Sequence, residues 1–388
     1  MMSFWDIERK IMEKVYADNS STSFPKAPGV SDAVKAFLDE GAYNAGRGGY
    51  GATYDVEMEV LAARKLLAHL FGAPARNVIF TPGVTYSLNM VLRGFLQPGD
   101  HVVTTSMEHN GVMRCLHDLA QSGVKYDVAP CDSDGGLDVA ILEKLINPAT
   151  KAVVVNHASN VCGTILPIYD IADICRARGV RLIVDAAQTA GLLPLDAARI
   201  DAIAFTAHKG LLAMPGLGGF VVSSDFASQI RPIISGGTGS MSADIAQPGF
   251  LPDKFESGTL NIPAIIGLKR ALEYIETIGV DAIHRKEMCL ADAFISGIRD
   301  IRGIKIIGKQ GTEDCIAVVS LDFVGRDNAE IAAKLDADHG IMTRCGLHCA
   351  PGAHRTLGTY PHGTVRFSFG HFNTQEEIAW ILSKLRHL

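Results

Sequence analysis

Several reactive side chains follow short apolar stretches, where a parallel sheet would bring them to one edge. Lys209 comes shortly after the apolar stretch 201–206 and is flanked by His208 and Gly210. A lysine at the end of a buried strand can form an imine with a carbonyl compound. The alternative is an ordinary surface lysine, so the interpretation depends on the residues that accompany Lys209.

A carboxylate stands at the end of a second apolar stretch. Asp185 ends residues 181–185, and Gln188 follows three positions later. Such a carboxylate can pair with a protonated ring nitrogen and make a cofactor ring an electron sink, while Gln188 can bond a ring hydroxyl. The alternative for Asp185 is a cap of the next helix.

Two further segments also lead out of strand-like stretches. Residues 81–85 read Thr-Pro-Gly-Val-Thr, and their backbone amides with the Thr85 hydroxyl can seat a phosphate at a helix start. His109 follows the stretch 101–105 and can lie flat on a cofactor ring. The alternatives are a common helix-start sequence and a structural histidine.

These features follow one order along the chain: phosphate loop, His109, Asn160, Asp185 with Gln188, and then Lys209. In this order the chain resembles fold-type I pyridoxal-phosphate enzymes of the class V aminotransferase group, from about residue 19 to residue 388. The resemblance implies pyridoxal 5'-phosphate as the cofactor. The expected cofactor contacts are Val84, Thr85, His109, Asp185, Gln188, Thr206, His208, Lys209 and Thr259. Thr259 lies in the segment 255–259, which is similar to a loop that reaches the phosphate of a neighbouring subunit.

The segment 344–351, Arg-Cys-Gly-Leu-His-Cys-Ala-Pro, narrows the resemblance. It is similar to the signature of group II cysteine desulfurases and the related bacterial selenocysteine lyases. The resemblance implies that Cys349 takes sulfur or selenium from L-cysteine or L-selenocysteine, leaving L-alanine and, for sulfur, a Cys349 persulfide. Arg366 and Asn160 match the residues that hold the substrate carboxylate. Lys209 and His109 are expected to act with Cys349 in catalysis.

Cys349 must be a thiolate to attack sulfur, so a cation is expected beside it. His348 and Arg344 are the nearest candidates in the sequence, and both are expected at the substrate site. The alternative for Cys349 is a small buried apolar residue. Cys345 occupies a variable position of the signature, although it could resolve a persulfide into a disulfide.

Other functions on the same scaffold stay open. They are a selenocysteine lyase, a cystine or cysteine β-lyase, a class V aminotransferase, and a non-catalytic cofactor-binding sulfur carrier. The sequence departs from its relatives at Val84, where many have Thr or Ser, and at residues 210–219, after the lysine. These departures concern the substrate more than the cofactor.

The spacing of apolar residues predicts the elements that position this chemistry. Short β-branched stretches alternate with amphipathic ones, which is typical of an α/β layer. The expected fold is a large α/β domain, residues 18–262, whose seven-stranded sheet is mixed and mostly parallel. Residues 1–17 and 263–388 are expected to form a smaller α+β domain that carries the Cys349 loop. Thr374 and Glu377 predict a capping box at the last helix.

Composition limits the remaining possibilities. The 388 residues carry a net charge of −6 without a basic stripe, so no nucleic-acid partner is expected. No apolar run reaches the roughly 20 residues of a membrane span, and Asp6 and Glu8 interrupt any signal peptide. The eight cysteines show neither metal-ligand spacing nor a disulfide framework. We expect a cytoplasmic homodimer with shared active sites, an amino-acid substrate and, as a further partner, a sulfur-acceptor protein.

Overall fold

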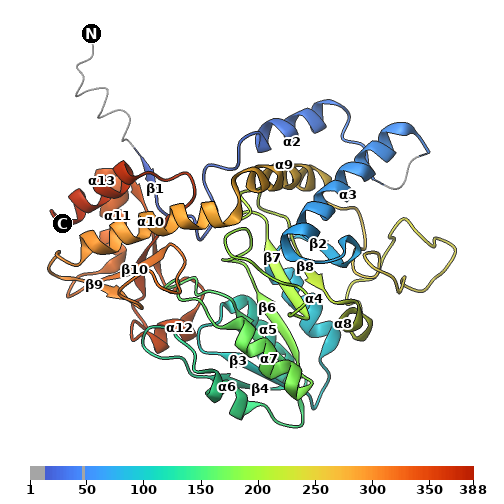
Figure 1. Cartoon of the computed structure of the whole chain (residues 1–388), viewed down its shortest axis with the longest axis horizontal. Coiled ribbons are helices and arrows are strands. Elements are labelled where there is room, and N and C mark those ends of the chain that lie inside the picture. The colour runs from blue at the N-terminus through green and yellow to red at the C-terminus, as the bar shows by residue number, and fades with distance from the viewer. Residues whose placement is uncertain (1–13, 46–48) are drawn as a thin grey trace.

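A seven-stranded sheet forms the centre of the computed structural model, which describes residues 14–45 and 49–388. Figure 1 shows it with helices on both sides. The strand order is β2-β8-β7-β6-β5-β3-β4. The strands are β2 (Val78–Thr81), β3 (His101–Thr105), β4 (Lys125–Ala129), β5 (Thr150–Asn156), β6 (Arg181–Asp185), β7 (Ala202–Thr206) and β8 (Gly218–Val222).

The direction of the strands confirms the predicted mixed sheet. Strands β4, β3, β5, β6 and β7 pair in parallel. Strand β8 runs antiparallel to both of its neighbours, β7 and β2. The carboxyl ends of the parallel strands therefore share one edge, where ligand sites of open α/β sheets lie.

Each central strand is apolar on both faces because helices cover both faces. In β5, Val153 and Val155 pack into one hydrophobic cluster, while Ala152 and Val154 pack into another on the opposite side. The first cluster includes residues of α3 (Gly51–Phe71), α6 (Val139–Leu145), α7 (Ile168–Arg178) and α9 (Ile262–Ile278). The second includes residues of α4 (Val84–Phe95), α5 (Asn110–Gln121) and α8 (Ser224–Gln229).

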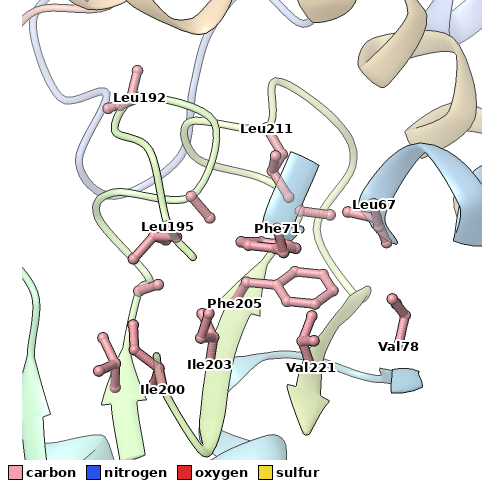
Figure 2. Packing of buried hydrophobic residues seen from close by; sticks show 14 of the residues in the cluster. Leu67, Phe71, Val78, Leu192, Leu195, Ile200, Ile203, Phe205, Leu211 and Val221 are labelled. Atoms are coloured by element: carbon pink, nitrogen blue, oxygen red, sulfur yellow. The ribbon is translucent and has the colours of Figure 1, made fainter. Parts of the chain in front are cut away.

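Aromatic packing joins α3 to the sheet. Figure 2 shows Phe71 of α3 against Phe205 of β7, with Leu67, Ile203 and Val221 around them. The two phenyl rings lie 5.3 Å apart between centroids. Strand β7 ends three residues before Lys209. This packing therefore holds in place the strand that leads to Lys209.

A second layer of antiparallel strands and helices forms the other end of the molecule (Figure 1). Its sheet has the order β12-β13-β10-β9, and the short strands β1 and β11 pair in parallel beside it. The strands are β1 (Val15–Tyr16), β9 (Ile304–Ile307), β10 (Val318–Phe323), β11 (Ile341–Met342), β12 (Arg344–Gly346) and β13 (Thr364–Ser368). Helices α10 (Val280–Ile298), α11 (Asn328–His339) and α13 (Gln375–Leu385) supply its core. The capping box of Thr374 and Glu377 at α13 is present as predicted.

The helix α9 differs from the sequence expectation, which assigned residues 263–388 to the smaller domain. Ala264, Leu268 and Leu272 of α9 join the hydrophobic cluster of the seven-stranded sheet, not that of the smaller one. Helix α2 (Val30–Asp39) contributes Val30 to the same cluster. Residues 1–13, also expected in the smaller domain, lie outside the described residues. The division into two domains otherwise stays a prediction.

None of the helices in residues 14–45 and 49–388 is long and apolar enough to cross a membrane. All eight cysteines are free.

A buried ion pair fixes the loop that leads to Thr259. The Arg64 guanidinium of α3 donates to both carboxylate oxygens of Glu256, at 2.8 and 2.9 Å, and both side chains are over nine-tenths buried. Glu256 Oε1 also accepts the Phe80 amide at 2.7 Å, and Arg64 donates to the Val78 carbonyl. The pair therefore joins α3, β2 and the loop that leads to Thr259.

We predict that Arg64→Ala lowers the free energy of unfolding by about 3–5 kcal/mol, because it leaves a buried carboxylate without its cation. Denaturant unfolding followed by circular dichroism measures the loss. The matched control is Arg176→Ala, which removes an exposed guanidinium 3.6 Å from Asp173 and should change stability by less than about 1 kcal/mol. Equal losses in the two variants would contradict the prediction.

Candidate active site

Several of the predicted site residues meet in one small cavity at the carboxyl edge of the seven-stranded sheet. Asp185 ends β6, and Lys209 follows the end of β7. His109 stands at the start of α5, and Val84 and Thr85 begin α4. The cavity is lined by Val84, Thr85, Leu88, His109, Gly111, Asn156, Ala158, Asn160, Asp185, Ala187, Gln188 and Lys209. Seven of these lining residues are among those that the sequence predicts for the site.

The amine of Lys209 is desolvated in this cavity. Burial is the largest influence on its pKa, which falls to about 8, and the nearby Arg366 and Arg344 lower it further while Asp185 opposes them. The neighbouring Gly210 lets the chain approach closely, since a Cβ there would lie 2.5 Å from the Ala190 carbonyl oxygen. Near neutral pH the amine thus has a substantial uncharged fraction, as a nucleophilic lysine requires.

Asp185 provides the negative charge that faces this amine. Its side chain is buried, and burial raises the pKa of Asp185, while the amide of Ala187 and the charge of Lys209 lower it. The Ala187 N–H donates to Oδ1 at 2.9 Å. Gln188, three residues beyond Asp185, lines the same cavity and donates through Nε2 to the Ser20 carbonyl at 3.2 Å.

His109 caps α5 through its ring. Nδ1 accepts the Gly111 amide at 2.9 Å, so that the ring proton of a neutral imidazole sits on Nε2. Burial, and then the charge of Lys209, lower the pKa of His109 to about 4. The ring is therefore neutral at physiological pH, which suits it to lie against a cofactor ring or to donate a proton through Nε2.

A second, more open cavity adjoins the start of α4. It is lined by Gly83, Val84, Thr85, Thr206 and His208, among others. Within the described chain no side chain caps α4, so its first amides face the opening, where helix N-termini bind anions. Burial, then Lys209 and Lys26, lower the pKa of His208 to about 4, and its Nδ1 has no protein partner in residues 14–45 and 49–388.

Arg366 and Asn160 lie together, as expected of a carboxylate-binding pair. Arg366 is only 1% exposed in the middle of β13, and its Nη1 donates to the Asn160 carbonyl at 3.0 Å. Its Nη2 donates to Asp18 at 2.6 Å, a contact that the sequence did not predict. Burial lowers the pKa of Arg366, and Asp18 opposes this effect. Arg366 Nε and Asn160 Oδ1 are buried without a partner among the described residues, so one polar atom of each side chain has an unused hydrogen-bonding capacity.

Cys349 lies on a loop between β12 and α12 (Pro351–Thr356) and is exposed. The loop is docked on the cavity wall, since Asn160 Nδ2 donates to the His348 carbonyl and the Asn110 amide donates to the Cys349 carbonyl, both at 2.7 Å. Arg344 Nη2 approaches the sulfur at 3.7 Å. Asn160 thus links the cavity with Lys209 to the loop with the thiol.

The two cations that the sequence offered to Cys349 behave differently. Arg344 contacts the sulfur, but the His348 ring faces Thr364, with Nε2 3.0 Å from its hydroxyl. Burial, then Arg366, lower the pKa of His348 to about 2, so the ring carries no charge. The expectation that His348 is the cation beside Cys349 is therefore corrected. Burial, together with the charge of Arg366, keeps the His348 imidazole neutral.

The pleat of β12 separates Cys345 from Cys349. Cys345 pairs with Val365, and Arg344 pairs with Arg366, so the two pairs face opposite sides of the sheet. Val365 belongs to the buried core of the smaller layer. Since Arg344 is the residue that contacts Cys349, Cys345 points away from that thiol, which argues against a resolving role.

Thr259 lies outside the two cavities described above. It is exposed and lines a third hollow, together with Thr81, Pro82 and Tyr86. The expectation that it reaches a neighbouring subunit's phosphate stays a prediction.

Comparison with known proteins gives one consistent family. The model of the family described as aminotransferase class-V matches residues 15–381. A probable cysteine desulfurase of Methanothermobacter thermautotrophicus is 31% identical over 96% of this chain and 95% of its own. A probable cysteine desulfurase of Pyrococcus abyssi is also 31% identical, over 97% of this chain and 94% of its own. The apo structure of a cysteine desulfurase from Thermococcus onnurineus matches with a TM-score of 0.90 at 31% identity, over 100% of this chain and 98% of that one. The structure of the cysteine desulfurase CsdA from Escherichia coli matches with a TM-score of 0.86 at 26% identity, over 100% of this chain and 98% of that one.

A buried carboxyl that sequence reasoning missed stands beside His109. Glu108 is 1% exposed, and its Oε1 accepts the Thr105 hydroxyl at 2.6 Å and the Asn156 amide at 3.1 Å. Burial raises the pKa of Glu108 from 4.5 to about 8. Between these two values an unfolded chain loses a proton that the folded chain keeps, so stability falls as pH rises through this window and then levels off.

We predict that E108Q removes this pH dependence, because an amide does not titrate. The free energy of unfolding of the variant, relative to the parent, should rise by roughly 2–4 kcal/mol between pH 5 and pH 8. Denaturant unfolding of both proteins without added cofactor measures the difference. The exposed Glu313→Gln serves as the control. A constant difference across this range would show that Glu108 ionises normally.

Proposed function

Because the chain belongs to the aminotransferase class-V family, we propose that it is a pyridoxal-phosphate-dependent cysteine desulfurase. The enzyme removes sulfur from L-cysteine and leaves L-alanine, with Cys349 as the first sulfur acceptor. The observation that carries the proposal is the position of Asn160, which lines the cavity with Lys209 and holds the loop of Cys349. The relatives named cysteine desulfurase support the same reaction.

The residues present fit pyridoxal phosphate. Lys209 supplies an amine for its aldehyde, Asp185 a carboxylate for its ring nitrogen, and His109 a neutral ring. The unpartnered His208 Nδ1 and the open start of α4 fit the phosphate. When bound, the cofactor supplies an electron sink for the α-carbon of the amino acid.

Each side chain then has a separate task. Arg366 and Asn160 bind the substrate carboxylate through the buried polar atoms that lack protein partners in the described chain. Lys209, with its pKa lowered to about 8, moves the proton at the substrate α-carbon. The neutral His109 supports this transfer through Nε2. Asp185 would pair with the ring nitrogen of the bound cofactor and favour the protonated form of that nitrogen.

The sulfur step belongs to Cys349. Its thiolate donates an electron pair to the substrate sulfur, so that an S–S bond forms while the substrate C–S bond breaks. The electron pair of the broken bond stays on the substrate carbon, which takes up a proton on the way to alanine. The guanidinium of Arg344 stands 3.7 Å from this sulfur and stabilises a negative charge there. The outer sulfur of the exposed Cys349 persulfide can then be transferred to an acceptor protein.

The proposal extends to assembly and location. We propose a homodimer in which the exposed Thr259 of each subunit completes the phosphate site of the other. A cytoplasmic location is supported by the eight free cysteines.

Removal of the lysine tests the cofactor. We predict that Lys209→Ala abolishes the covalent attachment of pyridoxal phosphate, because the described lining of the cavity contains no second lysine. Borohydride reduction followed by peptide mass spectrometry should find the cofactor on residue 209 in the parent only. The exposed Lys144→Ala serves as a control and should still label. Cofactor attached elsewhere in the parent would refute the assignment.

Removal of the thiol tests the reaction. We predict that Cys349→Ala lowers sulfide release from L-cysteine at least about 100-fold while cofactor absorbance persists, since the nucleophile itself is lost. Cys345→Ala is the matched control and should retain activity. Undiminished turnover of L-cysteine in Cys349→Ala would instead indicate a β-lyase, and retained turnover only of selenocysteine would indicate a selenocysteine lyase. Keto-acid formation would indicate an aminotransferase, and a coloured but inactive parent would indicate a non-catalytic carrier.

A further inference from the structure

Two arginines stand opposite each other on neighbouring strands beside the site. Arg344 of β12 pairs with Arg366 of β13 in antiparallel register. Like charges in directly opposite positions repel. Within the described residues the only carboxylate that pairs with either arginine is Asp18, whose Oδ1 accepts from Arg366 Nη2 at 2.6 Å. Two cations therefore share one anion.

The hydroxyl of Ser21 lies between these three charged groups. It accepts from Arg344 Nη1 at 3.0 Å and from Arg366 Nη2 at 2.8 Å. It donates to Asp18 Oδ1 at 2.8 Å. A hydroxyl offers one donor and two acceptor positions, so every valence of Ser21 is used and its orientation is fixed.

The segment that carries Ser21 is itself anchored on both sides. The Tyr16 hydroxyl lies 2.8 Å from the Thr22 carbonyl and spans the turn. The Ser20 amide donates to the Ser368 hydroxyl at 2.9 Å, at the end of β13. The Ser23 amide donates to the His208 carbonyl at 2.8 Å, next to Lys209. Ser21 is therefore held in place by the chain and does not merely follow the arginines.

We propose that Ser21 is a positioning residue that assigns the two arginines to two different anions. Arg366 is directed to the carboxylate of the amino-acid substrate, and Arg344 to the sulfur of Cys349. This inference rests on the proposed function for the identity of the two anions. The geometry that supports it is that each arginine keeps an open side, Arg344 with Nη2 3.7 Å from the sulfur and Arg366 with an unpartnered Nε.

The charges explain why a hydroxyl is needed at this point. A carboxylate can accept hydrogen bonds from several donors, so without Ser21 the Arg344 guanidinium is free to turn toward Asp18. It would then leave Cys349. Ser21 gives Arg344 a neutral acceptor and Asp18 a neutral donor, which leaves Asp18 as the ionic partner of Arg366 alone. Loss of the hydroxyl should thus affect the thiol and the carboxylate site together.

The test measures Cys349 directly, without turnover. The purified full-length chain is treated with iodoacetamide from pH 6 to pH 9, with and without pyridoxal phosphate, and the alkylation rate of each cysteine is read by peptide mass spectrometry. Iodoacetamide reports the thiolate. We expect Ser21→Ala to slow alkylation of Cys349 about 3- to 10-fold at pH 7, while Ser21→Thr, which keeps the hydroxyl, stays near the parent rate. The exposed Cys289 and Cys345 in the same samples are internal controls, and Ser228→Ala is a remote hydroxyl control.

A double-mutant comparison separates positioning from general damage. In an Arg344→Ala background, Ser21→Ala should have no further effect on Cys349, because the residue through which it acts is gone. An equal additional slowing in that background, or an unchanged rate in the single variant, would overturn the proposal. If Ser21→Ala fails to fold, Ser21→Gly removes the same hydroxyl and is judged by the same outcomes.

The proposed effect of Ser21 on substrate binding through Arg366 is tested by steady-state kinetics with L-cysteine. We expect the KM of Ser21→Ala to rise about 3- to 10-fold through Arg366, and the hydroxyl of Ser21→Thr to restore it. An unchanged KM would overturn this half of the proposal. A parent enzyme without activity on L-cysteine would refute the proposed function, whereas the alkylation result would still decide the role of Ser21.

Discussion

Burial of the Lys209 amine is the constraint on which the rest of the site depends. A buried amine is uncharged more often than an exposed one, which makes it a nucleophile, but the burial also makes every neighbouring charge costly. Asp185 is the buried anion that offsets it. The histidines nearby are neutral for the same reason, since burial lowers the pKa of His109, His157 and His208 to about 4. The site can therefore bind an anionic ligand while these histidines stay unprotonated.

The remaining charges also favour anions. Among the described carboxylates, Asp185 and Asp18 are the ones that raise the pKa of Lys209, and Asp18 also pairs with Arg366. The high pKa of Glu108, about 8, keeps that carboxyl protonated at neutral pH. A surplus of positive charge in a cavity attracts negatively charged ligands. Under the proposed function, the cofactor phosphate at the start of α4 and the substrate carboxylate at Arg366 would be two such groups. The electrostatics thus agree with a phosphorylated cofactor and an amino acid.

The sequence predicted those parts of the molecule that depend on local patterns. The strands 181–185 and 101–105 have the bounds of the strand-like stretches that the sequence indicates, because buried parallel strands read as short apolar, β-branched runs. The edge strand β4 was not predicted, since its exposed residues include charged ones and it lacks an apolar run. Helix α3 was also missed, because it begins at Gly51 after a glycine-rich stretch with no capping side chain in the described residues. At the site, Asp185 and Lys209 follow recognisable strands. Asp18 and Ser21 do not, since their role depends on contacts with residues more than 300 positions away.

The backbone around Cys349 shows how thiol and cofactor cavity depend on each other. His348 and Cys349 both have left-handed conformations, with φ of 48° and 59°. Such conformations cost about 1–3 kcal/mol each in residues other than glycine. The cost is offset by hydrogen bonds from outside the loop, namely from the Asn110 amide to the Cys349 carbonyl and from Asn160 Nδ2 to the His348 carbonyl. These two bonds hold the loop that carries the thiol against the site. Cys349 is exposed where it stands, whereas Arg366 is buried. Under the proposed function, the sulfur would therefore leave by the approach of an acceptor, while the amino acid would be held inside.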